Sequence, residues 1–172
     1  MQPIKVNQEI SLVPINESFL DDIFNNFSLQ VVKYLPLLEP TKDIKNTQSF
    51  IQGAVLKNEN QTDLIWVVLK NNKFIGCCGV RDINTRQGDF GYWLKTSEQG
   101  KGIGKIVAKT VFNWSFKTLD LDLIKYPVDK DNIASVKIIK SIGGKLAKQY
   151  IAGEENCLNI HEYHVLKKGI NT

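Results

Sequence analysis

Three glycines that alternate with other residues lie between a strand-like and a helix-like segment, and this arrangement constrains the fold more than any other part of the chain. Gly100, Gly102 and Gly104 follow the aromatic run 90–94 and precede an amphipathic run over residues 105–119. Glycine allows tight turns and leaves no Cβ near a ligand. The N–H groups at a helix start favour an anion, most often a phosphate. The pattern therefore predicts a phosphate-binding loop in an α/β fold.

Apolar periodicity predicts the elements around this loop. Strands are expected over residues 4–15, 64–70, 74–83, 90–94, 121–128, 145–150 and 160–167. Helices are expected over residues 17–27, from Thr41 or Asp43 to 57, and over 105–119 and 132–142. Because strand–helix–strand units alternate with hairpins, we expect one mixed sheet with helices on both faces. The 172 residues suit one core, so residues 1–172 are expected to form a single domain.

Composition narrows the class of protein. The net charge of +4 is modest and the lysines are spread along the chain, so no direct nucleic-acid binding is expected. The sequence shows no apolar run that predicts a membrane span and no signal-peptide pattern. Cys77 and Cys78 are adjacent and the third cysteine is Cys157, which predicts a reduced, cytoplasmic protein without a disulfide framework. His161 and His164 lack further ligands nearby, so no metal site is expected.

The spacing of the glycines excludes two nucleotide motifs. A Walker A loop needs Ser or Thr after its Gly-Lys pair, but Ile106 follows Gly104-Lys105, and Gln99 stands where the first glycine should be. A dinucleotide fingerprint needs a third glycine where this chain has Lys105 or, in the other register, Val107. A nucleotide-binding protein is therefore disfavoured. The loop alone is still compatible with a tight connection that binds no ligand.

The residues that flank the loop point to one superfamily. Residues 90–94 followed by 99–104 closely resemble the acetyl-CoA loop of the GCN5-related N-acetyltransferases (GNAT), and residues 131–143 resemble their later helix. The Asn132-x-x-Ser135 pattern resembles the RimJ/RimL-type ribosomal-protein N-acetyltransferases. The resemblance implies the acyl-CoA N-acyltransferase fold, with a mixed, mostly antiparallel sheet splayed in the middle. It also implies direct transfer of acetyl from acetyl-CoA, the co-substrate, to a primary amine, without a metal.

The resemblance also assigns the CoA contacts. It places the pyrophosphate on residues 99–104, and it places the pantetheine arm between residues 92–94 and the start of the strand at 121–128. Lys101 and Lys105 add positive charge, although each also fits a solvated helix side chain. The residues expected to contact CoA are Tyr92, Trp93, Leu94, Gln99, Gly100, Lys101, Gly102, Ile103, Gly104, Lys105, Asn132 and Ser135.

Two departures from the superfamily concern the catalytic groups. Many members carry a tyrosine that protonates the leaving thiolate where this chain has Ile139, and a Gly-Phe ending where it has Gly143-Gly144. In the RimJ/RimL type the serine that matches Ser135 is proposed to serve instead, although a serine here is also ordinary capping chemistry. Asp89 is the candidate base, or a solvated turn residue. The departures keep open a second hypothesis, a CoA-binding sensor or regulatory module with weak or no turnover.

The amine acceptor is the least determined part of the site. We expect contacts from Tyr34, Trp66, Arg81 and Asp89, and from the apolar segment that continues through Leu35 and Pro36. Protein N-termini, peptides, polyamines and small-molecule amines all remain candidates, and the subgroup resemblance favours an N-terminal amine. Monomer and homodimer both remain open.

Overall fold

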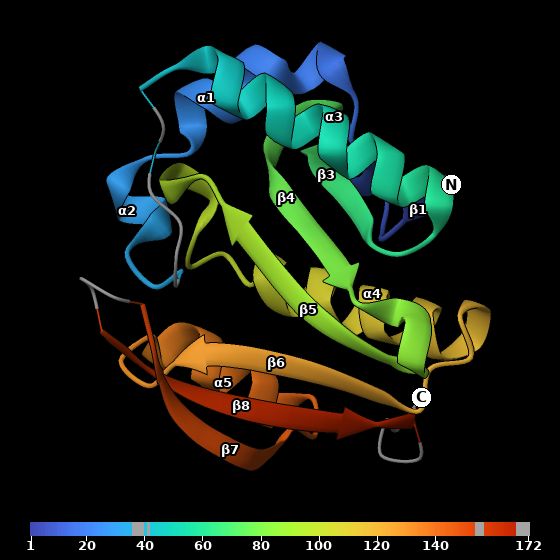
Figure 1. Ribbon diagram of the computed structural model, residues 1–172, viewed down its shortest axis with the longest axis vertical. Coiled ribbons are helices and arrows are strands. Elements are labelled where there is room, and N and C mark those ends of the chain that lie inside the picture. The colour runs from blue at the N-terminus through green and yellow to red at the C-terminus, as the bar shows by residue number, and fades with distance from the viewer. Residues whose placement is uncertain (36–39, 41, 154–156, 168–172) are drawn as a thin grey trace.

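The computed structural model, which describes residues 1–35, 40, 42–153 and 157–167, contains one eight-stranded sheet (Figure 1). Its strand order is β1-β2-β3-β4-β5-β6-β8-β7. All neighbours are antiparallel except β5 and β6. The expected mixed, mostly antiparallel sheet is therefore confirmed. The strands are β1 (Ile4–Lys5), β2 (Ile10–Pro14), β3 (Leu64–Lys70), β4 (Lys73–Arg81), β5 (Gln87–Leu94), β6 (Leu123–Asp129), β7 (Lys145–Ala152) and β8 (Leu158–Leu166).

Helices cover both faces of the sheet, as predicted. They are α1 (Leu20–Asn26), α2 (Leu29–Val32), α3 (Ile44–Asn60), α4 (Ile103–Thr118) and α5 (Ile133–Ser141). On one face, α1 and α3 bury Ile23, Ile51 and Ala54 against β3 and β4. On the other face, α4 and α5 pack against the larger core, which includes Val107, Phe112 and Ile139 (Figure 1). The sheet therefore separates two cores, and no helix of the described residues covers the face of β6 and β8 opposite α5.

Side chains cap the N-termini of α3 and α5. The Asp43 carboxylate accepts a hydrogen bond of 2.9 Å from the N–H of Lys45, which identifies Asp43 as the start of α3; the alternative, Thr41, lies outside the described residues. The Asn132 side chain accepts one of 3.2 Å from the N–H of Ser135 at the start of α5. These caps satisfy N–H groups that have no partner within the helix.

Some element boundaries differ from the prediction. The single strand expected over residues 4–15 is a hairpin, because the Asn7 side chain accepts hydrogen bonds from the N–H groups of Glu9 and Ile10 and turns the chain. The strand expected over residues 90–94 already begins at Gln87. The helix α4 begins at Ile103 rather than 105, and the short helix α2 was not predicted. None of the described helices is long and apolar enough to cross a membrane.

The parallel strands β5 and β6 separate after a short paired stretch. Only three pairs join them: Gln87 with Leu123, Gly88 with Ile124 and Asp89 with Lys125. Beyond this point β5 continues to Leu94 and β6 to Asp129 without pairing with each other. The two strands therefore form a V that opens toward their C-terminal ends (Figure 1). The backbone groups on the inner edges of the V are thus available to an extended ligand. The expected splay in the middle of the sheet is confirmed.

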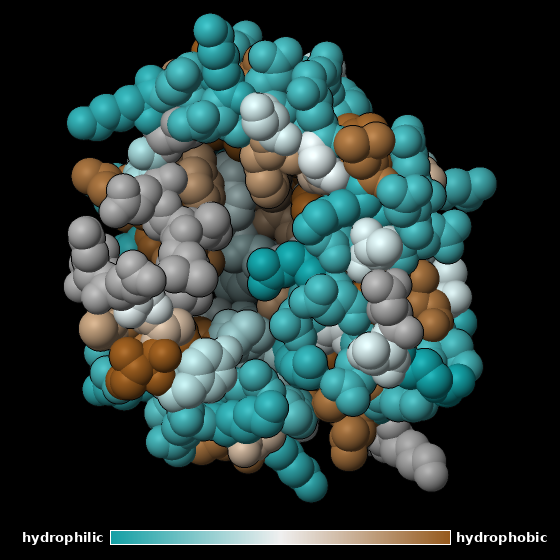
Figure 2. All heavy atoms as spheres, viewed as in Figure 1, coloured by the Kyte–Doolittle hydropathy of each residue, from teal (hydrophilic) through white to brown (hydrophobic). Residues whose placement is uncertain are grey.

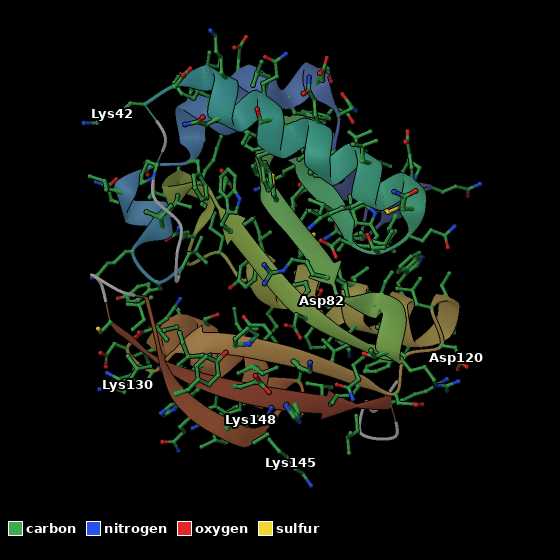
Figure 3. The ribbon with its side chains drawn as sticks, viewed as in Figure 1. Lys42, Asp82, Asp120, Lys130, Lys145 and Lys148 are labelled. Carbon is green, nitrogen blue, oxygen red and sulfur yellow. The ribbon has the colours of Figure 1, made fainter. Side chains whose placement is uncertain are left out.

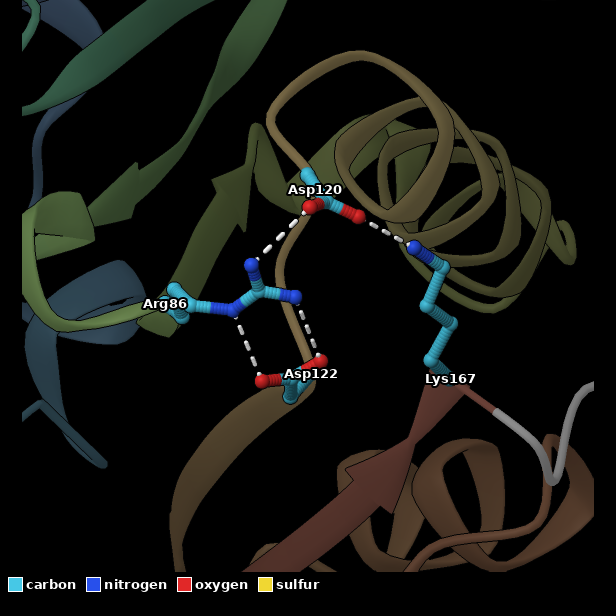
Figure 4. Close-up of polar contacts among 4 residues, drawn as sticks. All are labelled: Arg86, Asp120, Asp122 and Lys167. Atoms are coloured by element: carbon cyan, nitrogen blue, oxygen red, sulfur yellow. Dashed lines mark hydrogen bonds and ion pairs between the residues drawn. The ribbon is translucent and has the colours of Figure 1, made fainter.

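Charged residues hold the closed end of this V. Arg86, just before β5, donates two hydrogen bonds of 2.9 and 3.0 Å to Asp122 and pairs with Asp120 at 3.0 Å (Figure 4). Lys167, after β8, also pairs with Asp120. The hydrogen bond with Arg86 lowers the pKa of the Asp122 carboxyl, and the hydrogen bond with Lys167 lowers that of Asp120. This clamp joins the segments that precede β5 and β6 to the end of β8.

Candidate acetyl-CoA site

A cavity of about 650 Å³ occupies the opening of the V. Residues from four parts of the chain line it: the end of β5 and the glycine loop, the end of β6, the start of α5, and the segment around α2. Figure 2 shows that the molecule is hollowed on the face turned to the viewer. The cavity thus connects the glycine loop with the segment that was expected to bind the acceptor.

The glycine loop has the geometry of an anion site. Gly100 and Gly102 adopt left-handed φ values of +73° and +77°, which favour glycine. Gly102 is the N-cap of α4 and no side chain caps this helix, so its first N–H groups are left for a ligand. The Gln99 side chain donates a hydrogen bond of 2.9 Å to the carbonyl of Leu94, which ties the loop to the end of β5. These features fit the pyrophosphate of CoA.

Gly104 has a different role from the other two glycines. A Cβ on Gly104 would lie 2.8 Å from the Tyr92 hydroxyl oxygen, whereas Cβ atoms on Gly100 and Gly102 would meet nothing within 4 Å. We expected all three glycines to make room for phosphates. At Gly104 the missing Cβ instead makes room for the Tyr92 side chain, which lines the cavity.

The two lysines near the loop lie outside the described lining of the cavity. Lys101 forms an ion pair of 3.1 Å with Glu98, which also lies 3.7 Å from Lys70. The hydrogen bond with Lys101 lowers the pKa of Glu98. Lys105 is exposed on the first turn of α4. Their direct contacts with CoA therefore remain predictions.

Ser135 is buried at the cavity wall and is joined to a tyrosine that the sequence did not single out. Its hydroxyl lies 2.6 Å from the Tyr126 hydroxyl, and both residues line the cavity. Burial raises the pKa of Tyr126 well above its usual value, and the nearby Tyr92 phenol raises it further, whereas the hydrogen bond with Ser135 lowers it. Ile139, which stands where many superfamily members have a tyrosine, is fully buried, and its neighbour Ile138 lines the cavity.

Asp89 lies at the vertex of the V, on the opposite face from Ser135. It is the last β5 residue paired with β6, and its carboxylate forms an ion pair of 3.4 Å with Lys125. Phe90 belongs to the core beneath α4, so strand alternation turns Asp89 to the other face. Arg81 of β4 is the backbone register partner of Asp89, and its side chain is exposed. Neither Asp89 nor Arg81 is among the described lining residues of the cavity.

The predicted acceptor contacts separate into two groups. Tyr34 and Leu35 line the cavity together with Gln30 and Val31 of α2, whereas Pro36 lies outside the described residues. Trp66 is fully buried and packs edge-on against Trp114 of α4, with ring centroids 5.3 Å apart. The expected contact between Trp66 and the acceptor is therefore corrected, because an indole inside the core cannot reach a ligand in the cavity.

Beside the V, the uncovered face of β6, β7 and β8 carries mixed charges. Glu162 is 8% exposed; its carboxylate lies 2.6 Å from His164 Nε2 and 3.9 Å from Lys148. Lys148 and Lys145 extend from β7 on this side of the sheet (Figure 3). Within the described residues, no three His, Cys, Asp or Glu side chains are placed to hold a metal ion.

The structure also corrects the expected wall of the pantetheine channel. The start of β6 was expected to face CoA, but Leu123, Ile124 and Lys125 pair with β5, and the end of the strand, Tyr126 to Val128, lines the cavity. The alternation of Ile124, Tyr126 and Val128 shows in the sequence that they share a face. Their position relative to the opening depends on the register between β5 and β6. The alternation within one strand does not determine that register.

Comparisons with known proteins agree with this geometry. The chain is 25% identical over 146 residues to an uncharacterized N-acetyltransferase, p20, of Bacillus licheniformis, covering 81% of this chain and 82% of p20. Its fold matches RimL, a ribosomal L7/L12 alpha-N-protein acetyltransferase solved in complex with coenzyme A (TM-score 0.86, 18% identity, 95% and 97% of the two chains). It also matches the spermidine N-acetyltransferase of Vibrio cholerae solved with CoA and spermine (TM-score 0.82, 19% identity, 95% and 98%).

The sequence profile of one family covers most of the chain. The acetyltransferase (GNAT) domain matches residues 9–145, which include the glycine loop, the V and the start of α5. The superfamily inferred from residues 90–104 and 131–143 is thereby confirmed. The chain belongs to the GNAT family of acetyltransferases, whose co-substrate is acetyl-CoA.

Proposed function

We propose that this acetyltransferase transfers the acetyl group to the N-terminal amine of a protein or peptide. The observation that carries the proposal is that the carboxylates at the site are already engaged by cations. Asp89 pairs with Lys125, and the two carboxylates of the described cavity lining, Glu98 and Asp131, pair with Lys101 and Lys130. An ion pair must open before its carboxylate can accept the proton of the amine. The site therefore suits an amine that needs little help to lose its proton.

The amine's own pKa then decides which acceptor reacts. An N-terminal amine has a pKa of about 7.7–8.0 and a lysine side chain about 10.4, so at pH 7 the neutral fraction of the former is roughly 300 times larger. We assign Asp89 the role of base, directly or through one water, on the acceptor side of the sheet. Tyr34 and Leu35 border the acceptor's approach.

On the other face, the glycine loop and the start of α4 hold the pyrophosphate, and the inner edges of the V hold the pantetheine arm. Asn132 combines its cap of α5 with a contact to this arm, and Ser135 donates a hydrogen bond to the leaving sulfur. Acetyl-CoA supplies the activated acyl group. The V lets an amine approach from the Asp89 side while the thioester enters from the α4 side, so transfer needs no covalent acyl-enzyme.

Release of free CoA thiol in the presence of different amines tests the proposal. We expect a peptide with a free N-terminus to support release, and the same peptide with an acetylated N-terminus to support none. Asp89→Asn and Ser135→Ala should each lower turnover by about 10- to 100-fold, at the low end of acid–base contributions. Exclusive activity on spermidine, or on lysine side chains, would contradict the proposed acceptor. CoA binding without release for any amine would favour the alternative of a sensor module.

A further inference from the structure

Aromatic contacts with β5 and α4 hold the Tyr126 ring at the cavity wall. Its ring stacks on Phe90 of β5, with centroids 5.6 Å apart, and lies edge-on to Phe112 of α4 at 6.4 Å. Phe90 also stacks on Tyr92 at 5.9 Å. The three stacked rings bridge β5 and β6 where backbone pairing has stopped. The Tyr126 hydroxyl therefore has a fixed position.

That hydroxyl interacts with the hydroxyls of Ser135 and Tyr92, and the contact with Ser135 has a defined distance. It lies 2.6 Å from the Ser135 hydroxyl, in a pair that is buried from bulk solvent but borders the cavity. A phenol O–H is a better donor than acceptor, because its lone pair is delocalised into the ring. When Tyr126 donates to Ser135 Oγ, the Ser135 hydrogen cannot be directed at Tyr126 and turns toward the cavity. Hydrogen bonds in such a chain strengthen one another.

We propose that Tyr126 is a positioning residue that aims the Ser135 hydroxyl hydrogen at the leaving sulfur of CoA, and so supplies from β6 what a tyrosine at position 139 would supply from α5. This proposal rests on the proposed function. Burial raises the pKa of Tyr126, so the phenol stays protonated and has a hydrogen to donate.

The chemistry balances without a net change in either residue. The C–S bond breaks with its electron pair on sulfur, and the N–C bond of the amide forms. The proton that the acceptor nitrogen loses is the one that finally neutralises the thiolate. The Ser135 hydrogen bond stabilises the negative charge on sulfur in between, when it is largest. Tyr126 and Ser135 both end the reaction as they began it.

A double-mutant cycle tests the arrangement. Tyr126→Phe keeps the ring and its stacking and removes only the hydroxyl. We expect it to lower kcat about tenfold and to leave the KM for acetyl-CoA within about twofold, as the loss of one directed hydrogen bond predicts. In a Ser135→Ala background the same change should alter kcat less than about twofold, because coupled residues are not additive. Equal effects in both backgrounds, or no effect in either, would overturn the proposal.

The matched control is Tyr163→Phe. Tyr163 is also buried and lies opposite Tyr126 in the β6–β8 pairing, but it does not line the described cavity. Its kcat should stay within about twofold of wild type, which separates an effect on Ser135 from the general loss of a buried hydroxyl. A fall in kcat as large as that of Tyr126→Phe would assign the effect to core packing and contradict the proposal.

A second readout needs no turnover. The pKa of the thiol of bound CoA can be followed through the ultraviolet absorbance of the thiolate. Because a directed hydrogen bond stabilises the thiolate, this pKa should be higher in Tyr126→Phe than in wild type, and as high in Ser135→Ala. An unchanged value in Tyr126→Phe would refute the positioning role even if the acceptor were misassigned. If the pKa of the bound thiol rose in both variants as expected, but the wild-type enzyme did not acetylate N-terminal amines, only the proposed acceptor would be refuted.

Discussion

Gly104 serves both the first turn of α4 and the packing of Tyr92. It lies in the first turn of α4 at the wall of the cavity, and the Tyr92 side chain leaves no room for a Cβ at this position. Tyr92 in turn stacks on Phe90, whose ring holds Tyr126. A methyl group at this position would therefore displace the first of the three rings that bridge the V.

We predict that Gly104→Ala destabilises the protein by about 1–3 kcal/mol, the usual cost of inserting a group into a packed core. CoA binding should weaken as well, since Tyr92 lines the cavity. The matched control is Gly53→Ala within α3, where a Cβ would meet nothing within 4 Å. This control should gain about 0.5–1 kcal/mol from helix propensity. Urea unfolding and CoA titration measure both, and a Gly104→Ala variant as stable as wild type would contradict the packing described.

At this scale, motif spacing identified the glycines as site candidates, because they act through local backbone geometry, and the family resemblance added Asn132 and Ser135. It did not identify Tyr126, whose contact with Ser135 depends on how β6 lies against α5. It placed Trp66 wrongly, because an aromatic residue in a strand has the same pattern whether it faces a ligand or the core. Contacts that depend on register or on the facing layer are not written into short-range spacing.

At the scale of the elements, the V depends on where β5 and β6 stop pairing. The clamp of Arg86, Asp120, Asp122 and Lys167 fixes the closed end, and its groups are exposed. The carbonyl of Arg86 also accepts a hydrogen bond of 2.8 Å from the N–H of Asp122. Exposed ion pairs contribute little to stability and less at high salt. Here the clamp also joins the segments that lead into two diverging strands.

Asp122→Asn should lower stability at neutral pH and low salt, and the difference from wild type should shrink as the pH falls. The folded-state pKa of Asp122 is lowered by Arg86. Its contribution is therefore present above the unfolded value of about 3.9 and is lost as the pH falls through the lower folded value. Thermal unfolding between pH 7 and pH 3 measures this, with Glu59→Gln, an exposed position of α3, as the charge control. A difference that stayed constant over this range would rule out the charged clamp.

Periodicity predicted most elements, because amphipathic stripes and β-branched runs reflect which face is buried. It missed the hairpin at Asn7, where a side chain replaces a backbone partner, and the short α2. The splay between β5 and β6 was expected only through the family resemblance, and the strand order and the three-residue pairing of these strands were not predicted. They arise from contacts between segments more than 30 residues apart, such as Gln87 with Leu123.

Across the whole molecule, the two candidate catalytic groups lie on opposite faces of one sheet and the V connects the faces. Ser135 and Tyr126 belong to the α4–α5 side, and Asp89 lies on the side without α5. An acyl group held in the V is thus accessible to an amine from one side and to the hydrogen bond of Ser135 from the other. This arrangement is compatible with direct transfer, and we expect acceptor choice to rest with the residues around Asp89 and Tyr34.

The most direct measurement offers the enzyme one peptide that carries both a free N-terminal amine and an internal lysine. After incubation with acetyl-CoA at pH 7, fragmentation mass spectrometry locates the acetyl group, with Ser135→Ala as the reduced-activity control. Our account predicts acetylation of the N-terminal amine, because it is neutral roughly 300 times more often than the lysine and the described carboxylates near the site, Asp89 included, are paired with lysines. Acetylation mainly of the lysine would contradict the account, as would release of CoA thiol without acetylation of the peptide.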